Sequence, residues 1–282
     1  MSIVSFYNNS VEQTGKTMSI AAIATFMSIE HNYRILIIST TNKEENLKRC
    51  FWEEKKKRRN LGIFGPNANL EVQNGVEGLT RIIRSNKITP DIITNYTKVV
   101  FKDRLEVLLG SNQAESNSPE LQNLEQLYPE IIKSANQYYD LVFVDLDENV
   151  DEETKKTILE ISDVTVVNLS QRLRSVNNFA ENRENTKSIQ DRKRLILVGR
   201  YDKYSKYNYK NITRYLGEKN QVLTVPYNTL FMEAAEEAGV PDLFLKFRKL
   251  TNAEDINGFF ISEVKRASEN IIYRLQDLQM KL

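Results

Sequence analysis

Short apolar runs alternate along the whole chain with segments that have the spacing of helices. Residues 34–39 form the clearest run, rich in β-branched residues and without alternation of polar and apolar positions. A strand that is apolar on both faces is typical of a parallel sheet covered on both sides. Similar runs span residues 3–7, 105–110, 141–145, 164–169, 195–199 and 222–225. The pattern predicts an α/β fold with a doubly wound, mostly parallel sheet.

Segments with helical periodicity fill the intervals between these runs. In residues 16–30, Ile20, Ile23, Ala24 and Met27 fall on one face of a helix. Further helices are predicted at residues 44–59, 76–85, 90–96, 121–138, 175–187 and 261–282, with loops at 62–69 and 111–119. Because no internal repeat or flexible linker interrupts the pattern, we expect a single domain over residues 1–282.

Composition and charge exclude several classes of protein. Lys and Arg number 39 against 38 Asp and Glu, so a uniformly basic nucleic-acid coat is excluded. With 1 cysteine, Cys50, and 1 histidine, His31, the chain lacks the residues for a zinc or iron–sulfur cluster. No run is long enough to span a bilayer, and the first residues do not resemble a signal peptide. These features predict a cytoplasmic protein.

The most informative segment is residues 10–17, SVEQTGKT, between the first predicted strand and the first helix. A phosphate-binding loop has the pattern G-x-x-x-x-G-K-[ST] at this place. Gly15 permits close backbone approach, Lys16 would reach the β- and γ-phosphates, and Thr17 would bind Mg²⁺. Backbone N–H groups would surround the phosphates; they belong to Gln13, Thr14, Gly15, Lys16, Thr17 and Met18. Since Ser10 replaces the first glycine, the alternative is an ordinary strand–helix turn with an exposed lysine.

Asp145 ends the apolar run of residues 141–145. In phosphate-loop proteins a carboxylate at the end of such a strand helps to hold Mg²⁺. Thr17 and Asp145 are therefore the predicted metal residues. The alternative is that Asp145 only caps the next helix.

Taken together, these segments resemble the ParA/MinD family of deviant-Walker ATPases over nearly the whole chain. The family loop K-G-G-x-G-K-[ST] falls on residues 11–17, and its strand motif Y-D-x-x-x-x-D-x-P-P on 139–148, YDLVFVDLDE. Residues 195–202 and 225–228 resemble the segments that approach the base. The TadZ/CpaE-like branch, which is linked to Flp/Tad pilus assembly, is the most similar. The resemblance implies ATP and Mg²⁺ as cofactors, a homodimer, and a base pocket formed by Gly199, Arg200, Pro226 and Tyr227.

The loop departs from the family pattern. Val11 stands where the family has its signature lysine, which reaches the nucleotide of the partner subunit, and Glu12 and Gln13 replace two glycines. Glu12 would bring a negative charge close to phosphates, which is unfavourable unless it is well solvated.

The switch segments depart from the family as well. Ser39 and Thr41 replace the two switch aspartates, so the usual water-activating carboxylate is missing. Asp147 and Glu148 stand where two prolines are usual and are the remaining candidates for a catalytic base. Nucleotide binding is therefore favoured over hydrolysis, and ATPase activity is left open.

The sequence predicts an ATP-binding switch that dimerises or docks partners to position a pilus or secretion apparatus or a DNA cargo. The alternatives are a scaffold that has lost nucleotide chemistry and a DNA-partition module. The basic residues 55–59 would contact DNA or anionic lipid, or only form a solvated helix face. The apolar stripe of the last helix favours core packing or a partner helix over membrane binding.

Overall fold

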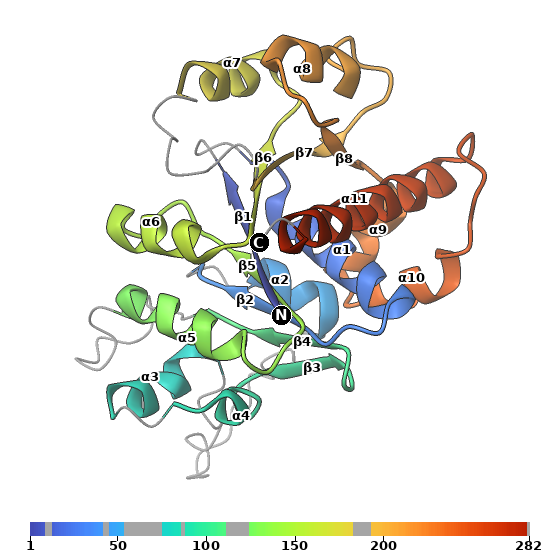
Figure 1. The fold of residues 1–282 in the computed structure, drawn as a ribbon. Coiled ribbons are helices and arrows are strands. Elements are labelled where there is room, and N and C mark those ends of the chain that lie inside the picture. The colour runs from blue at the N-terminus through green and yellow to red at the C-terminus, as the bar shows by residue number, and fades with distance from the viewer. Residues whose placement is uncertain are drawn as a thin grey trace, which may run out of the picture.

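The apolar runs form one sheet. The computed structural model describes residues 1–8, 13–41, 45–53, 75–85, 88–110, 124–182 and 193–280. Within these residues the sheet is 8-stranded, in the order β3-β4-β2-β5-β1-β6-β7-β8. Its ladders are parallel except the antiparallel pair β3–β4. Helices cover both faces (Figure 1), which confirms the predicted doubly wound α/β fold.

Most strands coincide with the predicted runs. The strands are β1 (Ser2–Asn8), β2 (Ile35–Ser39), β3 (Lys98–Phe101), β4 (Leu105–Leu108), β5 (Leu141–Asp145), β6 (Val164–Leu169), β7 (Arg194–Tyr201) and β8 (Leu223–Pro226). The edge strand β3 is not predicted by the sequence pattern. It has 4 residues, and Val99 is 52% exposed, so it leaves no buried apolar run to detect.

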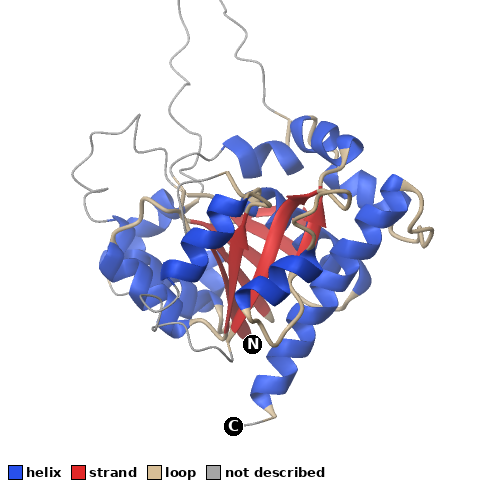
Figure 2. Ribbon diagram, turned by 90° about the horizontal axis from the view of Figure 1, so that it is seen from above, coloured by secondary structure: helices blue, strands red, loops and turns tan. Residues whose placement is uncertain are grey.

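Two sets of helices sandwich the sheet (Figures 1 and 2). On one face lie α1 (Lys16–Glu30), α2 (Glu45–Phe51), α9 (Thr229–Glu236), α10 (Val240–Phe247) and α11 (Ile256–Gln279). On the other lie α3 (Val76–Arg84), α4 (Pro90–Ile93), α5 (Tyr128–Ala135), α6 (Glu152–Ile161), α7 (Leu173–Asn182) and α8 (Tyr209–Leu216).

Several helix boundaries differ from the prediction. The helix expected over residues 90–96 ends at Ile93 and continues as turns. Part of the helix expected over 121–138 is the short 3₁₀ helix η2 (Leu124–Leu127), followed by α5. The last helix begins at Ile256 rather than 261, because the Asp255 side chain accepts hydrogen bonds from Asn257 and Gly258. Residues 55–59, 62–69, 111–119 and 183–187, on which other predictions fall, lie outside the described residues.

The last helix, α11, is a core element. Its apolar stripe is buried at Phe260, Val264, Ala267, Ile271 and Leu275, and the helix packs on α1 and β8. The Phe260 ring lies 4.9 Å from that of Phe231, measured between ring centres. No helix in the described part of the chain is long and apolar enough to cross a membrane.

The cap of α6 gives a pH-dependent prediction. The Asp151 carboxylate accepts a hydrogen bond from the Thr154 amide at 2.9 Å. This bond lowers the pKa of Asp151 from its ordinary value of 3.8. Asp151→Ala is therefore expected to lower the free energy of unfolding by about 1 kcal/mol at pH 7.

The sign of the pH dependence follows from the lowered pKa. A carboxyl whose pKa is depressed by folding stabilises the protein above its unfolded-state pKa, and this contribution is lost as the pH falls through the folded-state pKa. Urea unfolding of both proteins at pH 7 and at acidic pH measures the difference. Asp151→Asn, which keeps a capping oxygen, should stay close to wild type at pH 7. A difference between Asp151→Ala and wild type that grows toward acidic pH would contradict the assignment.

Candidate functional site

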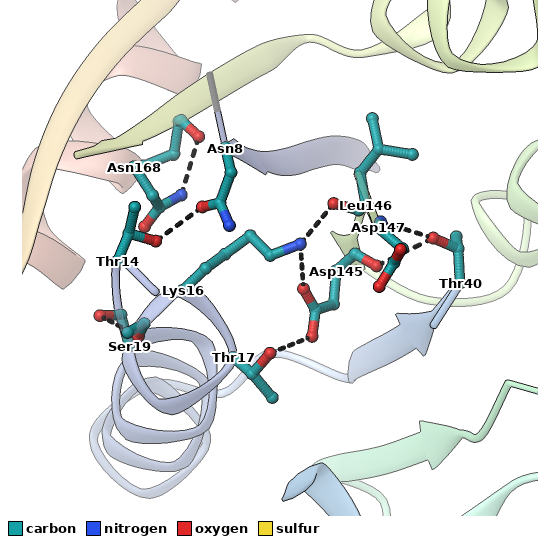
Figure 3. Close-up of polar contacts among 12 residues, drawn as sticks. Asn8, Thr14, Lys16, Thr17, Ser19, Thr40, Asp145, Leu146, Asp147 and Asn168 are labelled. Atoms are coloured by element: carbon teal, nitrogen blue, oxygen red, sulfur yellow. Dashed lines mark hydrogen bonds and ion pairs between the residues drawn. The ribbon is translucent and has the colours of Figure 1, made fainter. Parts of the chain in front are cut away.

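The site lies where the carboxyl ends of β1, β5 and β2 meet the start of α1. In the parallel ladders, Asp145 pairs with Phe6 of β1 and with Ser39 of β2. At this edge of the sheet, α1 begins beside the end of β5 (Figure 3). The carboxyl edge of a parallel sheet is the usual place for a ligand in an open α/β fold.

The first turn of α1 is suited to an anion. Gly15 precedes the helix with φ 77° and ψ 21°, a left-handed conformation that favours glycine. No side chain caps this described helix start, and its first turn carries no acidic residue. The first amides of a helix have no partner within the helix, and its dipole favours negative charge there. Phosphate oxygens match such a group of donors.

Lys16, Thr17 and Asp145 converge at this helix start (Figure 3). Lys16 Nζ lies 2.8 Å from Asp145 Oδ1 and also donates a hydrogen bond to the backbone oxygen of Leu146. Thr17 Oγ1 donates to Asp145 Oδ2 at 2.7 Å. The side chains of Lys16 and Asp145 are only 9% and 1% exposed, so their charges are held largely out of water.

The chemistry of these side chains fits a Mg²⁺ ion bound together with phosphates. Thr17 and Asp145 bring a hydroxyl and a carboxylate oxygen together, and such hard oxygens are the ligands that Mg²⁺ prefers. In the described part of the chain, no cluster of three or more His, Cys, Asp or Glu side chains could hold a metal by itself.

The end of strand β7 packs against the described part of the loop. A Cβ atom on Gly199 would lie 2.2 Å from the backbone oxygen of Thr14 and 3.2 Å from Ser19 Oγ. Thr14 Oγ1 donates to Asn8 Oδ1 at 2.6 Å, which ties the loop to the end of β1. The described end of the loop is thus fixed between β1 and β7.

Thr40 connects the end of β2 with the residues after β5. Its amide donates to the backbone oxygen of Asp145 at 3.1 Å, and its hydroxyl to the same oxygen at 3.2 Å. The hydroxyl also accepts from the Asp147 amide at 2.8 Å. Thr40 is not among the site residues predicted from the sequence. Its place directly after a strand, at the edge that carries Asp145, is the local signal for it.

The two candidate bases, Asp147 and Glu148, both accept hydrogen bonds from residues that follow them in the sequence. Asp147 Oδ1 accepts hydrogen bonds from the amide and the side chain of Asn149, both at 2.8 Å. The backbone oxygen of Glu148 accepts from Lys155 Nζ at 3.4 Å. Ser39, which stands at a switch-aspartate position, is buried, and its hydroxyl has no hydrogen-bond partner among the described residues.

The other predicted site residues spread along the same edge. Gln13 is exposed, and Met18 packs against the core. Arg200 follows Gly199 and lies over Gly15. Pro226 ends β8, and the Tyr227 amide donates to the backbone oxygen of Tyr201 at 3.0 Å, with the Tyr227 side chain 51% exposed. Ser10, Val11 and Glu12, and residues 42–44, lie outside the described residues.

Comparison with known proteins gives a fold and no sequence relative. No family model matches the chain, and no curated protein matches its sequence. A ParA family ATPase from Chlorobium tepidum TLS superimposes with a TM-score of 0.67 at 12% identity, over 97% of this chain and 98% of the other. The septum site-determining protein MinD from Pyrococcus horikoshii OT3, complexed with Mg-ADP, gives 0.65 at 14%, over 96% and 95%.

A third structure carries a nucleotide analogue. It is a Borrelia burgdorferi B31 protein described as a plasmid partition protein, bound to AMPPNP, with a TM-score of 0.60 at 17% identity over 99% of this chain and 98% of the other. At these identities the likeness concerns the course of the backbone over nearly the whole length. The chain has the fold of the ParA and MinD ATPases.

Proposed function

We propose that this protein is a nucleotide-binding switch that takes Mg-ATP at the start of α1. The observation that carries the proposal is the convergence of Lys16, Thr17 and Asp145 on a helix start without a side-chain cap. The amides from Gln13 to Met18 and the Lys16 ammonium would hold the phosphates. Thr17 and Asp145 would hold Mg²⁺, which when bound supplies positive charge to the phosphate chain. Pro226 and Tyr227 are proposed to line the base pocket.

The contacts of Asp145 suggest how nucleotide binding would affect the neighbouring segments of the chain. Asp145 pairs with Lys16 and Thr17 through its carboxylate, and with Thr40 through its backbone oxygen. Thr40 in turn holds the Asp147 amide. A ligand that recruits Lys16 and Thr17 changes the partners of Asp145 and thereby biases both neighbouring segments, around residues 39–41 and 145–149.

Hydrolysis is proposed to be weak or lost. Neither Ser39 nor Thr41 can act as a carboxylate base. Asp147 and Glu148 are the remaining candidates, and Asp147 Oδ1 already accepts two hydrogen bonds from Asn149. A base must be within reach of the attacking water to accept its proton.

The cellular role is proposed from the kinds of protein that share the fold. The structures with this fold include a plasmid partition protein, a septum site-determining MinD, and a MinC:MinD cell division complex from Aquifex aeolicus. We propose a positioning role in which the nucleotide-bound form dimerises or docks a partner. The cargo would be a pilus or secretion apparatus, as in the TadZ/CpaE-like branch, or DNA.

Substitution of Thr17 tests the metal side of the proposal. Thr17→Val keeps the shape but removes the hydroxyl, so the gain in ATP affinity on adding Mg²⁺ should fall by about tenfold, the usual scale for one contact to a charged group. Thr17→Ser keeps the hydroxyl and should retain the gain. Titrations with ATP in MgCl₂ and in EDTA measure it. An unchanged Mg²⁺ dependence in Thr17→Val would remove Thr17 from the metal site.

Light scattering coupled to size exclusion tests the switch itself. Wild-type protein is compared without nucleotide, with Mg-ADP and with a non-hydrolysable Mg-ATP analogue, and Lys16→Ala serves as the control. The proposal expects a larger mass only with the ATP analogue and only in wild type. The same mass in all conditions, together with ATPase activity no higher than in Lys16→Ala, would favour the non-enzymatic scaffold.

A further inference from the structure

The end of β7 contains a strained, charged residue beside the phosphate loop. Arg200 has a φ of 51°, in the left-handed region that residues with a Cβ rarely adopt. Such a conformation is unfavourable for a residue with a Cβ atom and persists only where the surroundings enforce it. A glycine at this position would avoid that cost, so the arginine side chain needs an explanation.

The strain belongs to a β-bulge that redirects this side chain. Along β7 and β8, Gly199 pairs with Val225 and Tyr201 pairs with Pro226, so Arg200 is an extra residue on β7. Arg200 is exposed, whereas its neighbours Gly199 and Tyr201 are buried. Bulges next to binding sites are a common way to re-aim one side chain.

The redirected side chain lies across the loop. A Cβ on Gly15 would be 3.1 Å from Arg200 Cγ and 3.7 Å from Arg200 Cδ, so the aliphatic stem of Arg200 rests on Gly15. Gly15 is the residue directly before the first amides of α1. The guanidinium begins at Nε, one bond beyond the Cδ atom that lies next to Gly15.

The charge of Arg200 has no partner in the part of the chain that the structure describes. Among the described residues, its guanidinium makes no ion pair and no hydrogen bond. Two half-buried arginines do have carboxylate partners: Arg49 pairs with Glu236 at 3.4 Å and Arg248 with Glu30 at 3.3 Å. A cation without a counter-ion beside a phosphate-type site matches the multiple negative charges of a phosphate chain.

We propose that Arg200 is a phosphate-binding residue, aimed by the β7 bulge at the phosphate chain of the nucleotide rather than at its base. The inference rests on the proposed function and adds a second cation, from another strand, to Lys16. It assigns Arg200 a different role from the base pocket that the family resemblance implies. Because Gly199 has no side chain, it then allows the bulge of β7 to lie close to the loop.

Two probes separate a phosphate contact from a base contact. Calorimetric titrations with Mg-ATP and with Mg-tripolyphosphate, which has no base, compare wild type with Arg200→Ala and Arg200→Gly. Both variants should bind both probes about tenfold more weakly, the scale of one charge-assisted contact. Arg214→Ala, on the exposed face of α8, controls for loss of an arginine and should bind both probes like wild type.

Thermal unfolding separates binding from structural support. Arg200→Gly relieves the left-handed strain, so its Tm should equal or exceed that of wild type while its affinity falls. Ala238→Gly is the matched control: Ala238 has a φ of 58°, and its replacement should spare both Tm and affinity. A purely structural Arg200 could not give a stable protein with weaker binding.

The outcomes are distinct. Unchanged affinities in Arg200→Ala, or weaker binding of Mg-ATP alone with tripolyphosphate unaffected, would overturn the phosphate role while the proposed function stands. Wild-type protein that binds neither probe would overturn the proposed function and this inference with it. Loss of binding in Lys16→Ala but not in Arg200→Ala would contradict the role of Arg200 and leave the proposed nucleotide site intact.

Discussion

Replacing Lys16 by alanine is expected to lower the affinity for Mg-ATP by about a hundredfold or more, because an ammonium that contacts several phosphate oxygens contributes roughly 1.5–3 kcal/mol for each charged hydrogen bond. The Lys16 side chain is 9% exposed and enters the site from the first turn of α1. No other lysine of the described loop and helix can replace it. Isothermal calorimetry on both proteins measures the change.

The same variant should also be less stable without nucleotide. Lys16→Ala leaves Asp145, at 1% exposure, with its Thr17 hydrogen bond but without its counter-ion. Removing one partner of a buried ion pair costs roughly 3–5 kcal/mol, and the Thr17 contact places the expected loss near the lower end. The double variant Lys16→Met with Asp145→Asn removes both charges and should recover much of the stability without recovering binding. Wild-type affinity in Lys16→Ala would remove the lysine from the site.

Gly199→Ala is expected to displace the loop, to destabilise the protein and to weaken nucleotide binding. The added Cβ would lie 2.2 Å from the backbone oxygen of Thr14, and a backbone atom cannot move aside as a flexible side chain does. Overpacking of this kind costs about 1–3 kcal/mol, and here it displaces the residue next to Gly15. We expect a lower free energy of unfolding together with an affinity for Mg-ATP that falls by about tenfold or more, since small displacements in a site have large effects.

Gly217→Ala is the matched control for Gly199→Ala. Gly217 ends α8 with a φ of 62°, and no atom lies within 4 Å of a Cβ placed there. The substitution should cost only the left-handed strain, about 1–2 kcal/mol, and leave nucleotide affinity unchanged. Equal affinities of Gly199→Ala and wild type would show that the contact with Thr14 does not shape the loop.

The sheet and the central part of the site could be predicted because their signals are local. Buried β-branched runs predict parallel strands, and parallel strands end at one edge of a sheet. That rule places Asp145 near the turn that carries Lys16 and Thr17, and the structure brings these three side chains together. The consecutive residues Gly15, Lys16 and Thr17 at the start of a predicted helix indicated the binding of phosphates and Mg²⁺.

The missed features depend on contacts between distant segments. The bulge at Arg200 arises from the register between β7 and β8, which no local pattern records. Gly199 reaches Thr14 because β6 and β7 follow β1 in the sheet, although the two residues are far apart in the sequence. Thr40 acquires its role only when β2 lies beside β5. The short edge strand β3 was missed because half-exposed residues leave no hydrophobic run.

Calorimetric titration of the wild-type protein with ATP, in MgCl₂ and in EDTA, tests the central claim most directly. If the start of α1 binds a nucleotide through Lys16, Thr17 and Asp145, the titration shows saturable binding to one site, and it is tighter with Mg²⁺. Millimolar ATP that produces no binding heat and no rise in Tm in either buffer would contradict the assignment of this helix start as a nucleotide site.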